Sequence, residues 1–231
     1  DSWRRQAKSS GYRARSAFKL LQIQDKFKLI REDDVVLDVG CHPGGWSQVA
    51  VELVGDGGKV IGVDLEPCQP VEGAILLVGD ITESSTQERI RNELDGRVIN
   101  NIVSDISPDI TGNWDIDQAV AMTLVADVLD FSLDLLCKGG SFITKIFQGV
   151  GIEELIVAVK PYFSNVRRFS PMASRNSSSE VYLICRNHMP WVKRETTIRQ
   201  TYETLLDVKL NPEEEVVKEQ VFTGFKLRKK K

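Results

Sequence analysis

The sequence has few of the residues that build metal sites or disulfide frameworks. Its 231 residues include two histidines and four cysteines, and no two cysteines form a C-x-x-C pair. Structural zinc sites need clusters of thiols and imidazoles, so we expect no metal site. Three of the four cysteines (Cys41, Cys68, Cys137 and Cys185) fall in apolar strand or helix patterns. Such patterns are typical of reduced, buried thiols and favour a reducing, cytoplasmic setting.

Long apolar runs are also missing. The apolar stretches are short and interrupted by charge, whereas a membrane-spanning helix needs about 20 consecutive, mostly apolar residues. No basic-then-apolar leader precedes the first predicted strand, so we expect neither a membrane span nor secretion. Hydrophobic residues still make up 42% of the chain. That fraction is ample for one globular core with a small appendage.

The net charge of −3 is unevenly distributed. Residues 1–19 contain six basic residues and one acid, and the chain ends in KLRKKK. Basic ends on an acidic protein favour a polyanionic partner that is contacted over a limited surface. A solvated tail explains the C-terminal run equally well. No heptad repeat or separate dimerisation segment is visible, so we expect a monomer.

Short runs of Val, Ile and Leu alternate along the chain with helical patterns. Strands that alternate with helices and are almost continuously apolar indicate a parallel sheet covered on both faces. Right-handed crossovers then produce an α/β, Rossmann-like fold. The predicted strands are 35–39, 59–63, 75–78, 98–104, 141–147, 165–169 and 181–185, and the predicted helices are 16–27, 46–54, 84–94, 116–136 and 152–162.

The last two predicted strands are joined without a helix. The connecting residues, SPMASRNSSSE, are too polar to cover a sheet face, which predicts an antiparallel hairpin at the edge of the sheet. A mostly parallel, seven-stranded sheet with an antiparallel terminal hairpin is typical of the class I methyltransferase fold, which uses S-adenosylmethionine. Composition changes after Asn187, and residues 188–231 contain one predicted helix, 196–206, and then a charged tail.

A glycine-rich turn follows the first predicted strand, in the sequence VVLDVGCHPGGWSQVA at 35–50. Glycines at this turn let a ligand approach the backbone, beside free N–H groups of the next helix. A dinucleotide site would require G-x-G-x-x-G, and His42 stands at the second glycine of that pattern. The turn therefore disfavours a dehydrogenase and fits S-adenosylmethionine better, because its methionine end needs no phosphate cradle.

Acidic residues follow three successive strands beyond this turn. Asp64, Asp80 and Asp105 stand where the second, third and fourth strands end. Because the carboxyl ends of parallel strands meet at one edge, we expect these carboxylates to surround one ligand. Asp64 is placed to accept hydrogen bonds from ribose hydroxyls, and Asp80 to meet the adenine amino group. Together with the glycine turn, they predict an S-adenosylmethionine site.

Seven blocks of the sequence, in order over 12–184, match one family: YRARSAFKL, LDVGCHPGGWSQVA, GVDLEP, GDI, SDISPDITG, GGSFITKIFQG and SRNSSSEVYLI. In these blocks the chain resembles the RrmJ/FtsJ family of RNA ribose 2′-O-methyltransferases. The resemblance implies a methyltransferase domain at 1–187 with a basic RNA-binding segment at 1–19, and leaves 188–231 as a charged extension. It implies methylation of RNA rather than DNA, most often of a uridine in large-subunit (23S) ribosomal RNA and within the subunit.

The resemblance also implies roles for individual residues. S-adenosylmethionine would be bound by Gly44, Trp46, Asp64, Asp80 and Asp105, and catalysis would rest on Lys19, Asp105, Lys145 and Glu180. Cys41 and His42 depart from the family pattern, in which two alanines are usual. His42 is either a tolerated surface substitution or a group that tunes cofactor affinity.

The four implied catalytic residues suit attack by a ribose 2′-hydroxyl. This hydroxyl must lose its proton as it attacks the sulfonium methyl, and a neutral lysine amine can accept that proton. Partial burial and a second nearby ammonium favour the neutral form of a lysine. We therefore predict that Lys145 is the base, that Lys19 assists it and positions the ribose, and that Asp105 and Glu180 orient the two amines.

Basic residues near an aromatic ring suggest where RNA would bind. Arg13 and Arg15 flank Tyr12, a pattern that suits phosphates and one stacked base. Ser174, Arg175 and Ser177 are further candidates for contacts with the RNA backbone.

Other functions stay open. The chain lacks the N-P-P-aromatic tetrad of amino-group methylases and has no cysteine at the end of the fourth strand, which disfavours base methylation. Ribose methylation of tRNA or of an mRNA cap remains an alternative. So does a non-catalytic ribosome-assembly or RNA-binding factor, although Lys145 and Asp105 favour an enzyme.

Overall fold

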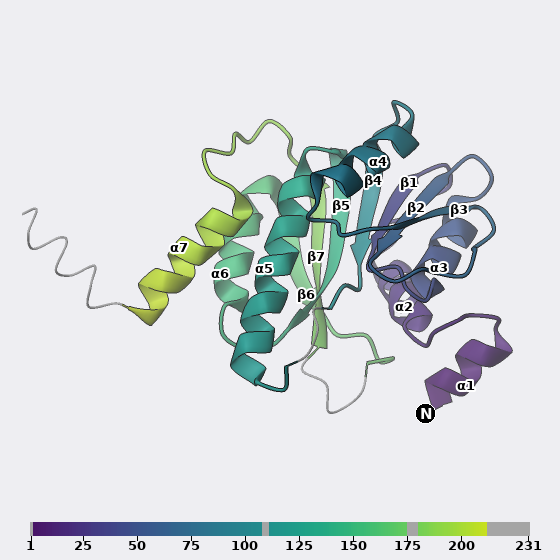
Figure 1. Cartoon of the computed structure of the whole chain (residues 1–231), viewed down its shortest axis with the longest axis horizontal. Coiled ribbons are helices and arrows are strands. Elements are labelled where there is room, and N and C mark those ends of the chain that lie inside the picture. The colour runs from purple at the N-terminus through teal and green to yellow at the C-terminus, as the bar shows by residue number, and fades with distance from the viewer. Residues whose placement is uncertain (1, 108–110, 175–179, 212–231) are drawn as a thin grey trace, which may run out of the picture.

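The structure, a computed structural model, describes residues 2–107, 111–174 and 180–211. These residues form one β-sheet with helices packed on both of its faces (Figure 1). None of the helices in these three ranges is long and apolar enough to cross a membrane.

The sheet has the strand order β3-β2-β1-β4-β5-β7-β6. Every pairing is parallel except those of β7 with β5 and with β6. This confirms the predicted mostly parallel sheet with an antiparallel terminal hairpin. The strands are β1 (Val35–Val39), β2 (Lys59–Asp64), β3 (Ala74–Val78), β4 (Ile99–Ser104), β5 (Leu136–Phe147), β6 (Phe163–Phe169) and β7 (Glu180–His188).

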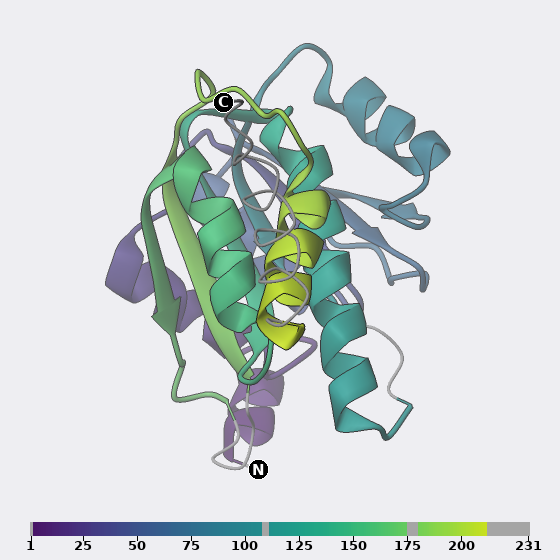
Figure 2. The ribbon, with the colours of Figure 1, turned by 90° about the vertical axis from the view of Figure 1, so that its left-hand side faces the viewer.

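Two apolar clusters lie on opposite faces of the sheet. On one face, α4 (Ser84–Leu94), α5 (Trp114–Leu133), α6 (Ile152–Val159) and α7 (Ile198–Leu210) contribute buried side chains, and η1 (Lys160–Tyr162) leads from α6 into β6. Figure 2 shows α5, α6 and α7 side by side. The other face is covered by α2 (Ala17–Phe27) and α3 (Gly45–Val54).

The strands follow the predicted buried pattern, which β1 illustrates. All five of its residues are buried. Val35, Leu37 and Val39 pack in the first cluster, whereas Val36 packs in the second. Because successive side chains point to opposite faces, a strand covered on both sides is apolar throughout. Asp38 is the exception, since it is a fully buried carboxyl group in this strand.

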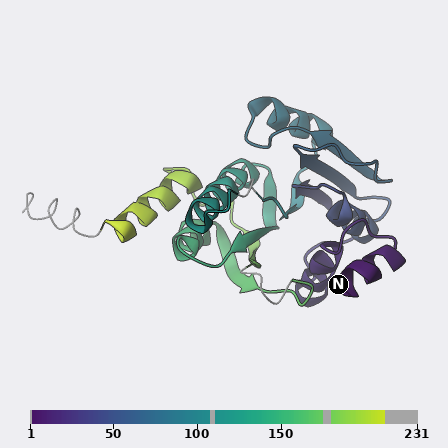
Figure 3. The same ribbon diagram turned by 60° about the horizontal axis from the view of Figure 1, so that its bottom comes forward.

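The largest differences from the sequence prediction concern α1 and the junction of α5 with β5. Helix α1 (Ser2–Ser9) was not predicted, because its sequence SWRRQAKS is mostly polar. It lies beside α2 (Figure 3), and Ala7 packs with Phe18 and Ala173. Strand β5 begins at Leu136 rather than at Ser141, so that α5 ends three residues earlier than predicted. Gly139 and Gly140 interrupt the apolar pattern there without ending the strand.

Helix α7 joins the first residues of the predicted extension to the core. Ile198 and Tyr202 are 1% and 2% exposed and lie in the first apolar cluster. Ion pairs add to this contact: Arg199 with Asp127 on α5, and Lys209 with Glu154 on α6. Residues 188–211 are therefore packed against the methyltransferase-like sheet through α5 and α6.

Replacement of Tyr202 by alanine tests whether α7 contributes to stability. Truncation of a buried aromatic side chain costs about 3–5 kcal/mol, because apolar contacts are lost and a cavity remains. We expect Tyr202→Ala to lower the free energy of unfolding by about 3 kcal/mol, measured by urea denaturation. Val208→Ala, at an exposed position of the same helix, should change it by less than about 0.5 kcal/mol. Equal small effects of both would mean that α7 does not stabilise the core.

Candidate active site

The glycine turn lies at the carboxyl edge of the sheet, between β1 and α3. Gly40 has a φ of +77°, and a Cβ there would come within 2.8 Å of the Ile106 Cα atom. Gly44 has a φ of +105°, and a Cβ there would lie 2.9 Å from the Arg13 guanidinium. Glycine is therefore required at both positions for conformational and steric reasons, whatever the turn binds.

A cavity of about 460 Å³ opens beside this turn. It brings together the three predicted carboxylates, Asp64, Asp80 and Asp105, and its apolar walls include Ile81 and Ile106. Asp64 accepts hydrogen bonds from the backbone N–H groups of His42 and Glu66, at 2.8 Å and 2.9 Å. The three acids predicted to meet therefore line one cavity, because parallel strands end at a common edge of the sheet.

Two other predicted cofactor residues lie outside the lining of this cavity. Gly44 faces Arg13 and Val71. Trp46 is 3% exposed, donates from Nε1 to the Ser16 carbonyl oxygen at 2.8 Å, and packs 5.6 Å from the Tyr182 ring centroid. Contacts of Gly44 and Trp46 with a cofactor therefore stay predictions.

Next to the cavity, four charged side chains form two ion pairs; we call Lys19, Asp105, Lys145 and Glu180 the charged cluster. Lys145 Nζ lies 3.4 Å from Asp105 Oδ1 and donates to the Asp105 carbonyl oxygen at 2.7 Å. Lys19 Nζ pairs with Glu180 Oε1. All four side chains are less than 20% exposed. The structure thus brings together the four residues implied by the resemblance, from α2, β5, β7 and the end of β4.

Tyr182 joins the two ion pairs and was missed from the sequence. Its hydroxyl lies 2.8 Å from Asp105 Oδ1 and 3.0 Å from Glu180 Oε1, so its one proton is shared between two carboxylates. Burial, followed by these two negative charges, raises the pKa of Tyr182 well above its ordinary value. The hydroxyl therefore stays protonated and can donate. The sequence could have indicated that Tyr182 lies beside Glu180, because residues two apart on a strand point to the same face.

Glu180 is kept ionised by its neighbours. Burial raises the pKa of this carboxyl group, but the hydrogen bond and charge of Lys19, the charge of Lys145 and the Tyr182 hydroxyl together outweigh it. The net result is a pKa below the ordinary value. A carboxylate that stays charged can hold the Lys19 ammonium in place across the pH range in which enzymes usually work.

Arg13 and Tyr12, which the sequence predicts to contact RNA, both have partners inside the protein. The Arg13 guanidinium donates to the carbonyl oxygens of Gln69 and Pro70, each at 2.5 Å, and to that of Pro43 at 3.3 Å. It thereby ties the loop after β2 to the glycine turn. Tyr12 donates to Glu52 Oε2 at 2.6 Å, and its ring packs edge-on against Phe18. Both side chains are occupied within the protein, because they have close internal partners.

Other predicted positions are placed as follows. His42 lines the cavity, is 41% exposed, and has Nε2 3.5 Å from Glu66 Oε2. Ser174 is half-buried, and its Oγ atom has no hydrogen-bond partner within the described part of the chain. Arg175, Ser177 and the C-terminal basic run lie outside the described residues. Within those described, no group of three His, Cys, Asp or Glu side chains could hold a metal ion.

Comparison with known proteins shows the family to which the chain is similar. The family model described as FtsJ-like methyltransferase matches residues 12–188. Ribosomal RNA large subunit methyltransferase E of Methanothrix thermoacetophila is 46% identical over 184 residues, which cover 80% of this chain and 71% of the relative. The protein of the same name from Neisseria meningitidis serogroup C is 40% identical over 187 residues, covering 81% and 91%.

A solved structure supports the same fold. The chain is similar to the crystal structure of a ribosomal RNA methyltransferase from Plasmodium falciparum, with a TM-score of 0.68 and 26% identity. The match covers 77% of this chain and 98% of that one.

Asp38 predicts a pH dependence of stability. Burial raises its pKa from 3.8 to about 7, the Ser47 hydroxyl opposes this rise, and the charges of Asp105 and Asp64 add to it. Its Oδ1 atom has no hydrogen-bond partner among the described residues. Between pH 4 and 7 the folded state therefore holds a proton that the unfolded state has lost, so stability falls as the pH rises through this range.

Replacement of Asp38 by asparagine should remove this dependence while keeping the shape of the side chain. We expect the free energy of unfolding of wild type to fall relative to that of Asp38→Asn by a few kcal/mol between pH 4 and 7, at about 1.4 kcal/mol per pH unit. Above about pH 8 the difference should stay constant. Parallel stability curves from urea titrations across pH 4–8 would contradict a raised pKa of Asp38.

Proposed function

The chain belongs to the FtsJ-like methyltransferase family, and we propose that it transfers a methyl group from S-adenosylmethionine to a ribose 2′-hydroxyl of large-subunit ribosomal RNA. The observation that carries this proposal is the charged cluster beside a cavity that holds three strand-end carboxylates. Two relatives that are 40–46% identical are named as methyltransferases of the large ribosomal subunit RNA, which supports the choice of substrate.

The cavity fits S-adenosylmethionine in its chemistry. The ribose and adenine of that molecule offer hydroxyl and amino donors, and Asp64 and Asp80 offer carboxylate acceptors. Each carboxylate oxygen can accept more than one hydrogen bond, so the backbone bonds to Asp64 leave capacity for a ligand. Ile81 and Ile106 provide apolar surface for the adenine ring. The bound cofactor would supply an electrophilic methyl group on a positively charged sulfur.

The charged cluster would activate and hold the ribose. Attack of the 2′-oxygen on the methyl carbon would break the bond between methyl and sulfur, and the hydroxyl proton would pass to Lys145 Nζ. This amine pairs with Asp105 and would have to release its own ammonium proton before it acts as the base. The Asp105 carbonyl oxygen fixes Nζ at 2.7 Å and so orients the amine. Lys19, held by Glu180, would position the ribose. Tyr182 keeps the two carboxylates in register, and alignment of the reacting atoms supplies much of the remaining rate.

The domain and partner assignments follow from the same proposal. We take 1–187 as the methyltransferase domain, which agrees with a family match that ends at residue 188. Residues 188–211 add α7 to its surface through Ile198 and Tyr202. We propose that the protein acts as a cytoplasmic monomer on RNA within the large subunit.

The first test is a methyl-transfer assay with wild type and Lys145→Ala. Radiolabelled S-adenosylmethionine is incubated with naked large-subunit RNA, intact large subunits or bulk tRNA, and the products are digested to nucleosides. We expect label in 2′-O-methylated nucleosides from the ribosomal substrates. Removal of the base should lower the rate about 10²–10⁴-fold. Lys160→Ala, at an exposed position of η1, is the matched control and should retain full activity.

Three results of this assay would contradict the proposal. Label on a base would exclude ribose methylation, and label in tRNA alone would exclude the ribosomal substrate. Full activity of Lys145→Ala would exclude its role as the base. Cofactor affinity of each variant, measured by calorimetry, separates a lost base from a lost binding site.

Asp80 tests the cofactor assignment separately. Its Oδ1 atom accepts two hydrogen bonds from Thr82, and its second oxygen has no such bond within the described residues. We expect Asp80→Ala to raise the Kd for S-adenosylmethionine about tenfold, because a hydrogen bond to a charged group contributes about 1.5–3 kcal/mol. The KM for RNA should stay unchanged. Glu83→Ala, an exposed acid nearby, is the control, and equal Kd values for both variants would contradict the assignment.

A further inference from the structure

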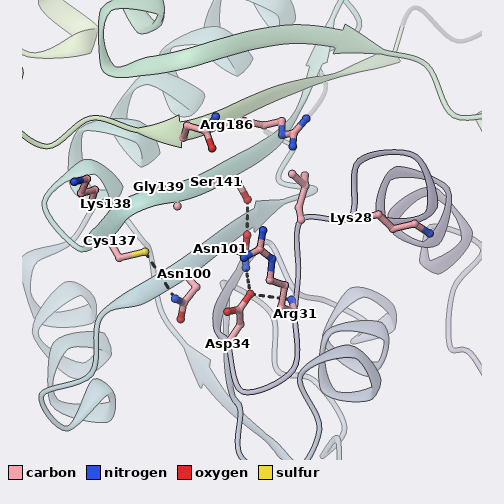
Figure 4. Close-up of a pocket in the computed structure, with 13 residues that line it drawn as sticks. Lys28, Arg31, Asp34, Asn100, Asn101, Cys137, Lys138, Gly139, Ser141 and Arg186 are labelled. Carbon is pink, nitrogen blue, oxygen red and sulfur yellow. Dashed lines mark hydrogen bonds between the residues drawn. The ribbon is translucent and has the colours of Figure 1, made fainter.

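A second pocket lies at the other end of the sheet, where β4 and β5 begin and β7 ends (Figure 4). We call it the distal pocket. Its volume is about 170 Å³, less than half that of the cofactor cavity. Four basic residues and one acid line it, together with neutral polar groups: Lys28, Arg31, Lys138 and Arg186, then Asp34, then Asn100, Asn101, Ser141 and Asn187.

The distal pocket and the charged cluster share one face of the sheet. Asn101 pairs with Ser141, and continuation of the β5–β7 register places Arg186 beside Ser141. Two residues along, the same face carries Val103, Ile143 and Ile184, which are buried under α2 and α3. Two residues further, it carries the following reactive groups: Asp105, Lys145 and Tyr182. Four residues of strand span about 13 Å, which is the approximate distance between the two polar rows.

Strand β5 begins irregularly beside the pocket. The β4–β5 register shifts between Ile99 and Asn101. Gly139 has a φ of +78° with open space around it, whereas a Cβ on Gly140 would lie 2.8 Å from the Asn100 carbonyl oxygen. Gly139 therefore takes a left-handed conformation, and Gly140 packs closely against β4 beside the polar side chains of the pocket.

The acid in the pocket is already hydrogen-bonded. Asp34 Oδ2 accepts from the Arg31 backbone N–H at 2.8 Å and from Asn101 Nδ2 at 2.6 Å. Ser141 in turn donates to Asn101 Oδ1. Asp34 Oδ2 and Asn101 Oδ1 are thus engaged in hydrogen bonds within this network.

Two guanidinium groups are available to a ligand. The side chains of Arg31 and Arg186 make no hydrogen bond or ion pair with any residue that the structure describes. Lys28 is paired with Asp25 and points away from the pocket (Figure 4), and Lys138 lies over the Trp191 ring. In a protein of net charge −3, this local excess of positive charge favours an anion.

We propose that the distal pocket binds a phosphate group of the RNA backbone, about 13 Å from the nucleotide that is methylated. Planar guanidinium groups match the geometry of phosphate oxygens, and the small volume suits one phosphate rather than a nucleoside. This inference rests on the proposed function, because RNA is the polyanion that the candidate active site would hold. From there the strand would pass around α2, which covers the apolar row between the two polar ends. The contact positions the strand and carries no sequence preference.

Direct binding of large-subunit RNA, without a methyl donor, tests the proposal in wild type, Arg186→Gln and Arg186→Lys. We expect Arg186→Gln to raise the Kd for RNA about tenfold. The slope of log Kd against log salt concentration should fall by about 1, which corresponds to the loss of one phosphate contact. Arg186→Lys keeps the positive charge but loses the planar guanidinium group. Its Kd for RNA should therefore lie between those of wild type and Arg186→Gln. With saturating RNA, kcat should equal that of wild type, because Arg186 does not touch the reacting atoms.

The control is Arg91→Gln, which removes the same charge from α4 on the opposite face of the sheet. It should leave RNA affinity and its salt dependence unchanged. Melting temperatures of all variants establish that each is folded. Equal loss of affinity in Arg91→Gln and Arg186→Gln would overturn the proposal, because general charge and not the pocket would then be responsible.

Two further outcomes separate the source of the phosphate from the proposed function. If inorganic phosphate raises the melting temperature of wild type but not of Arg186→Gln, while RNA affinity is equal in both, a free phosphate and not RNA occupies the pocket. Equal RNA affinity alone overturns the RNA contact and leaves methylation standing. Absence of methyl transfer by wild type overturns the proposed function instead.

Discussion

Pairing of buried charges at the carboxyl edge of the sheet is the constraint on which the rest of the structure depends. Lys19 is 6% exposed, and a charge buried to that degree is stable only with a partner. Glu180 is that partner, and it reaches this edge because β7 runs against the other strands and so begins where they end. The antiparallel hairpin is therefore needed for the site as well as for the edge of the sheet.

The same face of β4, β5 and β7 divides into a polar end, an apolar middle and a second polar end. Lys145, Ile143 and Ser141 follow this order along β5. The apolar middle anchors α2, whose first turn carries Lys19. Packing of the core and placement of a reactive amine are thus achieved by one helix. If the distal pocket holds RNA, a single rigid sheet face would align both the backbone and the reacting ribose.

Two charged side chains have roles that are decided by their surroundings inside the protein. Arg13 has the charge and position expected of a phosphate contact, yet its guanidinium binds three carbonyl oxygens and holds the cofactor-side loops together. Asp38 looks like an ordinary acid at a strand end, but complete burial changes its protonation. In both cases the charge was visible in the sequence, whereas the surroundings that decide its role were not.

The sequence by itself determined the order of strands and helices, the glycine turn, and the meeting of Asp64, Asp80 and Asp105 at one edge. Local periodicity and the common direction of parallel strands suffice for these features. The placement of Lys19 and Glu180 in one site came only from the resemblance, because 161 residues separate them in the chain. Tertiary structure alone decided that Tyr182 joins both ion pairs, that α7 packs on α5 and α6, and that Arg186 faces an open pocket. Each of these depends on strand register and side-chain packing between distant segments, which no local pattern encodes.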